Sequence, residues 1–317
     1  MAIPISQRIF VDAVTKYCLA RNITVEVRSE AWLIVMQRGQ RRHLAFAYDV
    51  GLNSAVAHQI ANDKAATAEV LQCFGVPCIP HTLFLGPKLA AYTRSAGSWE
   101  TMLRLLAEHP NGLVVKPNEG TSGEGVFRVT TKHALELAVG RILAAYPSLA
   151  ISPYVEIEDE IRVVLVDDLP VVVYSKERPF VIGDGRHSLL ELALAAMPAE
   201  RRSTALPGLI AAIGRAELDA IVPEGERRIL NWRHNLDSGA RPVLLKQGET
   251  RDTCIEIAIK AARAIGIRFG SIDVVRTDGA WRILEVNAGV KMEALSRSHP
   301  ELAYAAYEAA LDRVFAQ

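Results

Sequence analysis

FGSIDVVRTDGAWRILEVNAGVKM, residues 269–292, is the stretch that decides the fold expected for this chain of 317 residues. Two apolar, β-rich runs are joined at Thr277-Asp278-Gly279-Ala280, and Asp-Gly between such runs strongly predicts a β-hairpin. Three polar side chains interrupt the apolar pattern: Asp273, Glu285 and Asn287. One face of a strand presents both Glu285 and Asn287, because they are two residues apart. Asp273 is expected across the hairpin, within one register step of Glu285.

The polar face of this hairpin has two interpretations. Two carboxylates and an amide oxygen that face one space form an all-oxygen site suited to Mg²⁺, which keeps some waters and shares phosphate oxygens. Alternatively, the acidic residues keep a solvated sheet edge soluble. The metal interpretation requires a phosphate-binding segment elsewhere in the chain.

Length and composition limit the class of protein. The chain is long enough for two or three subdomains, and its 36 basic and 36 acidic residues leave no basic surplus for nucleic acid. No apolar run reaches the roughly 18–20 residues of a membrane span, and the first residues do not form a secretory signal. The four scattered cysteines form no Cys-x-x-Cys pair, which favours free thiols in a reducing cytoplasm over a zinc site or disulfides.

A second informative stretch, residues 113–127, reads LVVKPNEGTSGEGVF. An apolar strand carries Lys116 near its end, a loop with three glycines follows, and a second strand begins. Glycine lets backbone N–H groups converge on an anion without obstruction by a Cβ atom. The pattern is neither a Walker A motif nor a dinucleotide fingerprint, since the loop connects two strands. The interpretations are a phosphate-binding loop and a plain hairpin turn.

A helix is expected over residues 63–74, with Asn62 as its N-cap and Gly75 just after its end. Lys64 falls in the first turn, where the helix dipole disfavours a cation. Local conflicts of this kind concentrate at functional sites, and the alternative is an ordinary surface lysine.

Other segments predict mainly structure. Residues 150–155 are expected to form a linker strand between lobes. Ser188 and Glu191 form a capping box that begins a helix, and Asp252 is expected to cap a helix over residues 253–265. The polar segment 233–240 is either an ordinary loop or brings the Arg233 guanidinium and the Asn235 amide towards an anionic group.

Three features resemble the ATP-grasp superfamily and occur in its order. They are the lysine that begins a helix, the strand-lysine-glycine hairpin and the late hairpin with Asp…Glu-x-Asn. The resemblance covers roughly residues 61–293. It is closest to the amino-acid-ligating branch, including the ATP-grasp part of cyanophycin synthetase and the ribosomal-protein glutamate ligases. The stretches that carry this closer likeness are residues 181–188, 233–236 and 261–275.

The resemblance implies an α+β (α/β) protein with the ATP-grasp fold, in which two α+β lobes clamp the nucleotide. A small N-terminal α/β domain (residues 1–60) would precede a first lobe with the glycine-rich lid hairpin (61–149) and a second lobe with the metal-binding hairpin (150–317).

The resemblance also implies roles for individual residues. Lys64 and Lys116 would hold phosphates, the glycine loop would cover the β and γ phosphates, and Glu160 would bind the ribose hydroxyls. The full nucleotide-binding set is Lys64, Lys116, Gly120, Thr121, Ser122, Gly123, Gly125, Tyr154, Val155, Glu160, Lys176 and Arg178. The catalytic set is Arg233, Lys176 and Asn235. The metal set, for two Mg²⁺ ions with Mn²⁺ as an alternative, is Asp273, Glu285 and Asn287.

The activity implied is an ATP- and Mg²⁺-dependent ligase that converts a carboxylate into an acyl phosphate and joins it to an amine. The alternatives are a kinase on the same fold and a catalytically silent nucleotide-binding module. The expected substrates are small molecules, amino acids or peptides, with no nucleic acid or membrane partner and with a homodimer as the common default. Tyr154 and Val155 would lie near the adenine through their backbone. The family usually has Glu or Gln where this chain has Ser152-Pro153, and it often has a Pro-Gly turn where this chain has Ala288-Gly289 after Asn287.

Overall fold

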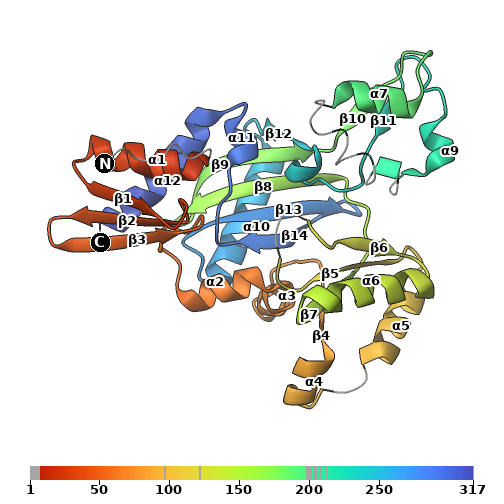
Figure 1. The fold of residues 1–317 in the computed structure, drawn as a ribbon, viewed down its shortest axis with the longest axis horizontal. Coiled ribbons are helices and arrows are strands. Elements are labelled where there is room, and N and C mark those ends of the chain that lie inside the picture. The colour runs from red at the N-terminus through yellow and green to blue at the C-terminus, as the bar shows by residue number, and fades with distance from the viewer. Residues whose placement is uncertain are drawn as a thin grey trace. The chain divides into compact units, whose positions relative to one another are not determined.

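The computed structural model describes residues 8–95, 98–120, 123–197, 202, 206, 209–210 and 213–316, excluding the side chain of Ser238. The chain forms two compact units: Met1–Tyr174 with Leu245–Gln317, and Ser175–Leu244. Figure 1 shows the elements of each. Among the described helices, none has the length and apolar character that crossing a bilayer requires.

The first unit begins with a small sheet beside two helices. The strands are β1 (Thr24–Arg28), β2 (Leu33–Arg38) and β3 (Arg41–Phe46), each antiparallel to the next. Helix α1 (Ile9–Ala20) lies beside the last helix of the chain, α12 (Pro300–Phe315) (Figure 1). The rings of Phe10 and Tyr307 meet edge to face, with 5.1 Å between centroids, so the two ends of the chain share one core.

The central sheet of the first unit has the strand order β9-β8-β13-β14. Its strands are β8 (Asp159–Val166), β9 (Leu169–Glu177), β13 (Phe269–Thr277) and β14 (Ala280–Asn287). The tight turn at Asp278 and Gly279 has positive φ at both residues, 50° and 72°, as a two-residue hairpin with matching twist requires. The expected hairpin is therefore confirmed. β9 continues into the second unit, where β12 (Arg241–Leu244) is its neighbour.

Three helices pack against the apolar residues of this sheet: α2 (Ala55–Asn62), α3 (Lys64–Cys73) and α10 (Glu249–Ile265). Their shared core includes Leu71, Ala258, Ile272 and Val274, all fully buried. Successive residues of a strand point to opposite faces of the sheet, so the polar side chains at the alternate positions lie on the face away from these helices.

A second sheet in the first unit has the order β4-β7-β5-β6, with all neighbours antiparallel. Its strands are β4 (Thr82–Leu85), β5 (Leu113–Pro117), β6 (Phe127–Val129) and β7 (Ser148–Pro153). Helices α5 (Ser98–Glu108) and α6 (Lys132–Ala145) pack on it through a core that includes Leu113, Leu135 and Ile151. Two short helices complete the unit, α4 (Pro87–Thr93) and α11 (Glu293–Ser296).

The second unit has its own small core. β10 (Phe180–Ile182) pairs antiparallel with β11 (Arg227–Ile229), next to α7 (Leu189–Ala196), α9 (Arg215–Leu218) and the 3₁₀ turn η1 (Leu236–Ser238). Val181, Leu189, Leu218 and Leu230 are among the buried residues. The predicted capping box is confirmed: Ser188 accepts from the Glu191 N–H, and the Glu191 side chain accepts from the Ser188 N–H.

Three local predictions were wrong. The N-cap of α3 is Asp63, which accepts from Ala66 N at 2.7 Å, because Asn62 already ends α2. The helix with Asp252 begins earlier, at Glu249, with Gly248 as its cap. Residues 150–155 do not form a linker strand: β7 lies between β4 and β5, inside a sheet.

Candidate functional site

The acidic residues of the hairpin stand in one row across three strands. Asp273 pairs with Glu285 of β14, and on its other side with Arg162 of β8. Side chains directly opposite each other on paired strands share a face of the sheet. Arg162, Asp273 and Glu285 therefore face the same side. Asn287, paired with Ser271, shares this face with Glu285 as expected.

Arg162 holds the Asp273 carboxylate with two bonds. Its Nε donates to Oδ1 and its Nη2 to Oδ2, each at 2.7 Å. The Asp273 side chain is 2% exposed and that of Arg162 16%. Burial works against the charged guanidinium, but the carboxylate of Asp273 raises the pKa of Arg162 well above its usual value. No role was predicted for Arg162, although Glu160 and Arg162 are charged residues two positions apart in a largely apolar strand.

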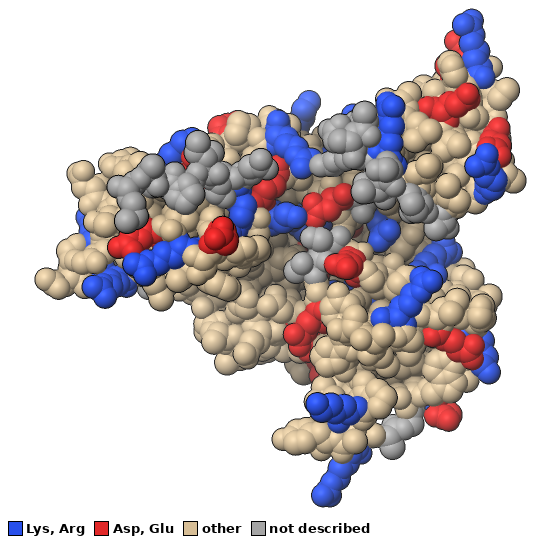
Figure 2. All heavy atoms as spheres, in the orientation of Figure 1, with Lys and Arg blue, Asp and Glu red and all other residues tan. Residues whose placement is uncertain are grey.

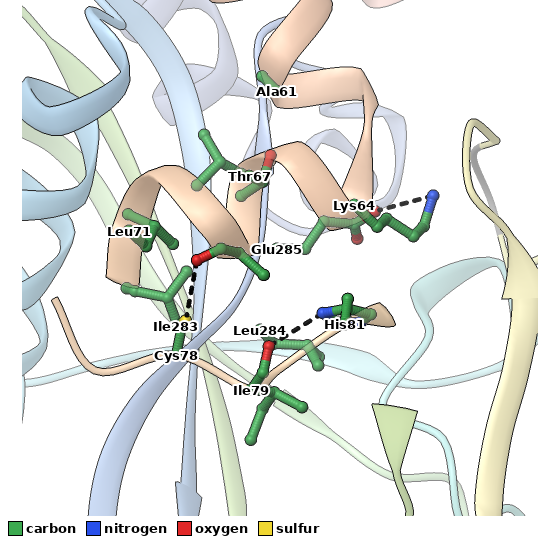
Figure 3. Close-up of a pocket in the computed structure, with 12 residues that line it drawn as sticks. Ala61, Lys64, Thr67, Leu71, Cys78, Ile79, His81, Ile283, Leu284 and Glu285 are labelled. Carbon is green, nitrogen blue, oxygen red and sulfur yellow. Dashed lines mark hydrogen bonds and ion pairs between the residues drawn. The ribbon is translucent and has the colours of Figure 1, made fainter. Parts of the chain in front are cut away.

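Lys64 approaches the row from the side of Glu285. It is the first residue of α3, and its Nζ donates to the carbonyl oxygens of Asn118 at 3.3 Å and Gly120 at 3.0 Å. Its Nζ also lies 3.9 Å from Glu285 Oε1 (Figure 3). Burial lowers the pKa of Lys64, and the charge of Glu285 opposes that effect. The position of Lys64 at the start of α3 therefore brings its ammonium group close to the Glu285 carboxylate and to the glycine loop.

Lys116 is the second lysine of this region, and it is buried. It lies in β5 and is 9% exposed. Burial lowers the pKa of Lys116 to about 8. The charges of Glu285 and Glu160 oppose this effect, and the charge of Lys64 adds to it. Within the described part of the chain, the ammonium group of Lys116 has no hydrogen-bond or ion-pair partner. A buried ammonium in this state is suited to receive an anion.

These buried charges differ from those of the surface. Figure 2 shows basic and acidic side chains interspersed over one face. In contrast, Lys116, Glu160 and Asp273 are at most 9% exposed. Charges in such surroundings are weakly screened, so they act strongly on a ligand that reaches them.

A small pocket, partly open to solvent, lies between α3, residues 78–81 and residues 283–286 of β14 (Figure 3). Lys64 and Glu285 line it, and so does His81, which sequence reasoning missed. The His81 Nδ1–H donates to Ile79 O at 2.9 Å, and its buried Nε2 has no partner among the described residues. Burial and the charge of Lys116 hold the pKa of His81 well below its usual value. The ring is therefore neutral.

The other predicted nucleotide-binding residues of the first unit lie around the second sheet and β8. Tyr154 follows β7, where its N–H donates to Gly112 O at 2.9 Å and the Arg128 guanidinium stacks 3.5 Å from its ring centroid. Glu160 is buried in β8. The loop after β5 contains Gly123 and Gly125 with φ of 73° and 67°. Val155 follows Tyr154 directly, whereas Thr121 and Ser122 lie outside the described residues.

The remaining predicted residues belong to the second unit. Lys176 is 4% exposed near the end of β9, and Arg178 follows that strand. The ring Nδ1–H of His234 donates to Lys176 O at 2.7 Å, which places Arg233 and Asn235 beside the same strand. Burial lowers the pKa of Arg233. This bond joins the segment that contains Lys176 and Arg178 to the segment that contains Arg233 and Asn235.

The donor set at the hairpin fits a hard divalent ion. Glu285 offers a carboxylate that is 31% exposed, and the Asn287 amide has a buried Nδ2 without a partner in the described chain. Carboxylate and amide oxygens with room for water are what Mg²⁺ requires. Among the described residues no three His, Cys, Asp or Glu side chains form a metal cluster, so an ion here depends on Asn287.

Comparisons with known proteins identify the fold. Residues 219–303 match the RimK-like ATP-grasp domain. A probable α-L-glutamate ligase of Legionella pneumophila (strain Corby) is 21% identical over 81% of this chain and 65% of its own length. Cyanophycin synthetase of Trichormus variabilis is 24% identical over 89% of this chain and 31% of its own length. The chain thus spans less than two thirds of either relative.

Solved structures of ligases have a fold similar to that of this chain. The D-alanine–D-alanine ligase of Bacillus anthracis superposes with a TM-score of 0.55 at 15% identity, over 83% of this chain and 69% of that one. The bifunctional glutathione synthetase of Pasteurella multocida gives 0.51 at 16% identity, over 92% and 44%. The chain therefore has the ATP-grasp fold, as its sequence predicted, and its residues 219–303 are similar to the RimK-like ATP-grasp domain.

Proposed function

We propose that the chain is an ATP- and Mg²⁺-dependent ligase that joins a carboxylate to an amine. One observation carries this proposal: two lysines from different elements, Lys64 with a side chain 10% exposed and Lys116 at 9%, lie in the electrostatic field of Glu285. The ammonium of Lys116 has no partner in the described chain, and a polyphosphate would supply its counter-charge. Lys64 also contacts the glycine loop at Gly120. The same side chain would therefore contact the loop, the Glu285 carboxylate and a bound nucleotide.

Relatives named glutamate ligase and cyanophycin synthetase, and a neighbouring structure of a D-alanine–D-alanine ligase, support ligation as the reaction. For this chain we propose amino acids or short peptides as the carboxylate and amine substrates. A homodimer, a cytoplasmic location and the three-part division at residues 60 and 149 stay predictions.

The reaction that we propose has two steps. A carboxylate oxygen of the first substrate attacks the γ phosphorus of ATP, the bond to the β,γ-bridging oxygen breaks, and an acyl phosphate and ADP form. The amine nitrogen of the second substrate then attacks the acyl carbon, phosphate leaves, and the nitrogen loses a proton. The acyl phosphate is needed because a free carboxylate is a poor electrophile.

The residues of the chain act by position and charge in this scheme. Lys64 and Lys116 bind the phosphates, and the fixed cations stabilise the charge that spreads over the transferring group. Gly120, Gly123 and Gly125 let the loop approach the phosphates and exclude water, which would otherwise hydrolyse the acyl phosphate. We assign Tyr154, Val155 and Glu160 to the nucleoside.

For the second unit we assign Lys176 and Arg178 to the transferring phosphate, and Arg233 and Asn235 to anionic substrate groups. Bound Mg²⁺ supplies further neutralisation of phosphate charge. Its proposed ligands on the chain are Glu285 and Asn287, next to Asp273.

The test is phosphate release from ATP with Mg²⁺, screened over amino acids singly and in pairs. We expect release only with a particular carboxylate–amine pair, and none from Glu285→Ala. Tyr92→Ala is a matched control, because Tyr92 is 85% exposed in α4. Phosphate transfer without release would instead indicate a kinase, and release without an amine would contradict ligation.

A further inference from the structure

We propose that Arg162 takes the place of a second metal ion: it holds Asp273 from the side, and the chain binds a single Mg²⁺ through Glu285 and Asn287. The inference rests on the proposed nucleotide-dependent function. It departs from the two-ion site that the sequence resemblance implies, and it assigns Arg162 a positioning role.

The first argument is the geometry of the pair. Both Asp273 oxygens accept a bond of 2.7 Å from the Arg162 fork. Planar, bidentate pairing of this kind is the strongest form of charge-assisted hydrogen bond. An ion at Asp273 would have to share both oxygens with a guanidinium that lies on the same face of the sheet.

The second argument is room for water. The Asp273 side chain is 2% exposed, whereas that of Glu285 is 31% exposed. Mg²⁺ gives up its hydration shell reluctantly and usually keeps several waters when it binds a protein. The two carboxylates are neighbours in register, yet only Glu285 is open enough for a hydrated ion.

The third argument is the order of charges across the sheet. From β8 to α3 the row runs Arg162, Asp273, Glu285 and Lys64, with a cation at each end and two carboxylates between them. Arg162 pairs with the first carboxylate at 2.7 Å, but Lys64 approaches the second only to 3.9 Å. Asp273 is therefore neutralised by the chain itself, and Glu285 keeps charge available for an ion.

The test counts bound metal. Mn²⁺ binding in the presence of the non-hydrolysable analogue β,γ-imido-ATP is titrated by electron paramagnetic resonance on the full chain. We expect one nucleotide-dependent Mn²⁺ per chain. Asp273→Asn should keep that ion with an affinity within about threefold, whereas Glu285→Gln should weaken it by more than about tenfold, since it removes the ligand.

A gain of function completes the test. Arg162→Gln, which removes the guanidinium from the Asp273 carboxylate, should bind a second Mn²⁺, and Arg162→Lys, which keeps the charge but loses the fork, should not. If Arg162→Gln does not fold, the comparison of Asp273→Asn with Glu285→Gln decides alone. Two ions in the unaltered chain, or equal losses in those two variants, would overturn the inference. No nucleotide-dependent Mn²⁺ binding at all would overturn the proposed function as well.

Discussion

Removal of Arg162 should be among the most destabilising single changes in the central sheet. Arg162→Met leaves the Asp273 carboxylate, 2% exposed, without its bidentate partner in the middle of that sheet. Breaking a buried ion pair by deleting one partner costs about 3–5 kcal/mol, because the remaining charge stays buried. We expect Arg162→Met to lower the free energy of unfolding by that amount.

The double variant Arg162→Met/Asp273→Asn separates pairing from packing. It removes both charges, and neutral replacements of a buried pair are often nearly neutral for stability, so the loss should be less than about 2 kcal/mol. The free energies come from urea unfolding followed by circular dichroism, with slopes compared between variants.

An exposed pair in the same unit is the control. Arg263 Nε donates to Asp168 Oδ2 at 3.1 Å, with side chains 68% and 40% exposed. Arg263→Met should therefore change stability by less than about 1 kcal/mol. A loss for Arg162→Met no larger than that of the control would refute the argument from burial.

Three further predictions concern the lysine, the hairpin and the cap of α3. Because burial lowers the pKa of Lys116 to about 8, the protein should take up a proton when it binds β,γ-imido-ATP at pH 9 but not at pH 6.5. Calorimetry in two buffers of different ionisation enthalpy measures this uptake, and Lys116→Met should abolish the difference. Gly270→Ala should weaken Mn²⁺ binding, because the added Cβ would lie 2.8 Å from Asn287 O. Gly140→Ala, in open space on α6, is the control: it should leave Mn²⁺ binding unchanged and add about 0.5–1 kcal/mol to the unfolding free energy. An unchanged Mn²⁺ titration for Gly270→Ala would contradict this prediction. Asp63→Ala should cost about 1 kcal/mol in urea unfolding, and no loss would argue against Asp63 as the cap.

Local signals explain what the sequence predicted well. The hairpin follows from Asp278-Gly279, since the turn and its flanking strands are adjacent in the chain. The turn sets the register as far as Val274 opposite Ile283, and a shift of register between Val274 and Asp273 then places Asp273 opposite Glu285. The ATP-grasp fold was recognisable because its informative segments occur in order. The assignment of individual site residues to ligands stays a prediction.

Non-local pairing explains what the sequence missed. Arg162 and Asp273 are 111 positions apart, and their contact depends on the register between β8 and β13, which no turn specifies. The same holds for β7, which looks like a linker until β4 and β5 pair with it. The error at Asn62 is different: a helix that was not predicted, α2, ends there, and the cap moves to Asp63.

The most direct test of acyl-phosphate ligation follows an oxygen atom. With the carboxylate substrate found by the phosphate-release screen, labelled with ¹⁸O in its carboxyl group, the released phosphate is examined by ³¹P NMR. The proposed reaction predicts one ¹⁸O atom in every phosphate released, because the carboxylate oxygen that attacks the γ phosphorus leaves with it. Phosphate without label would mean that water attacked the nucleotide, and it would contradict the proposed function.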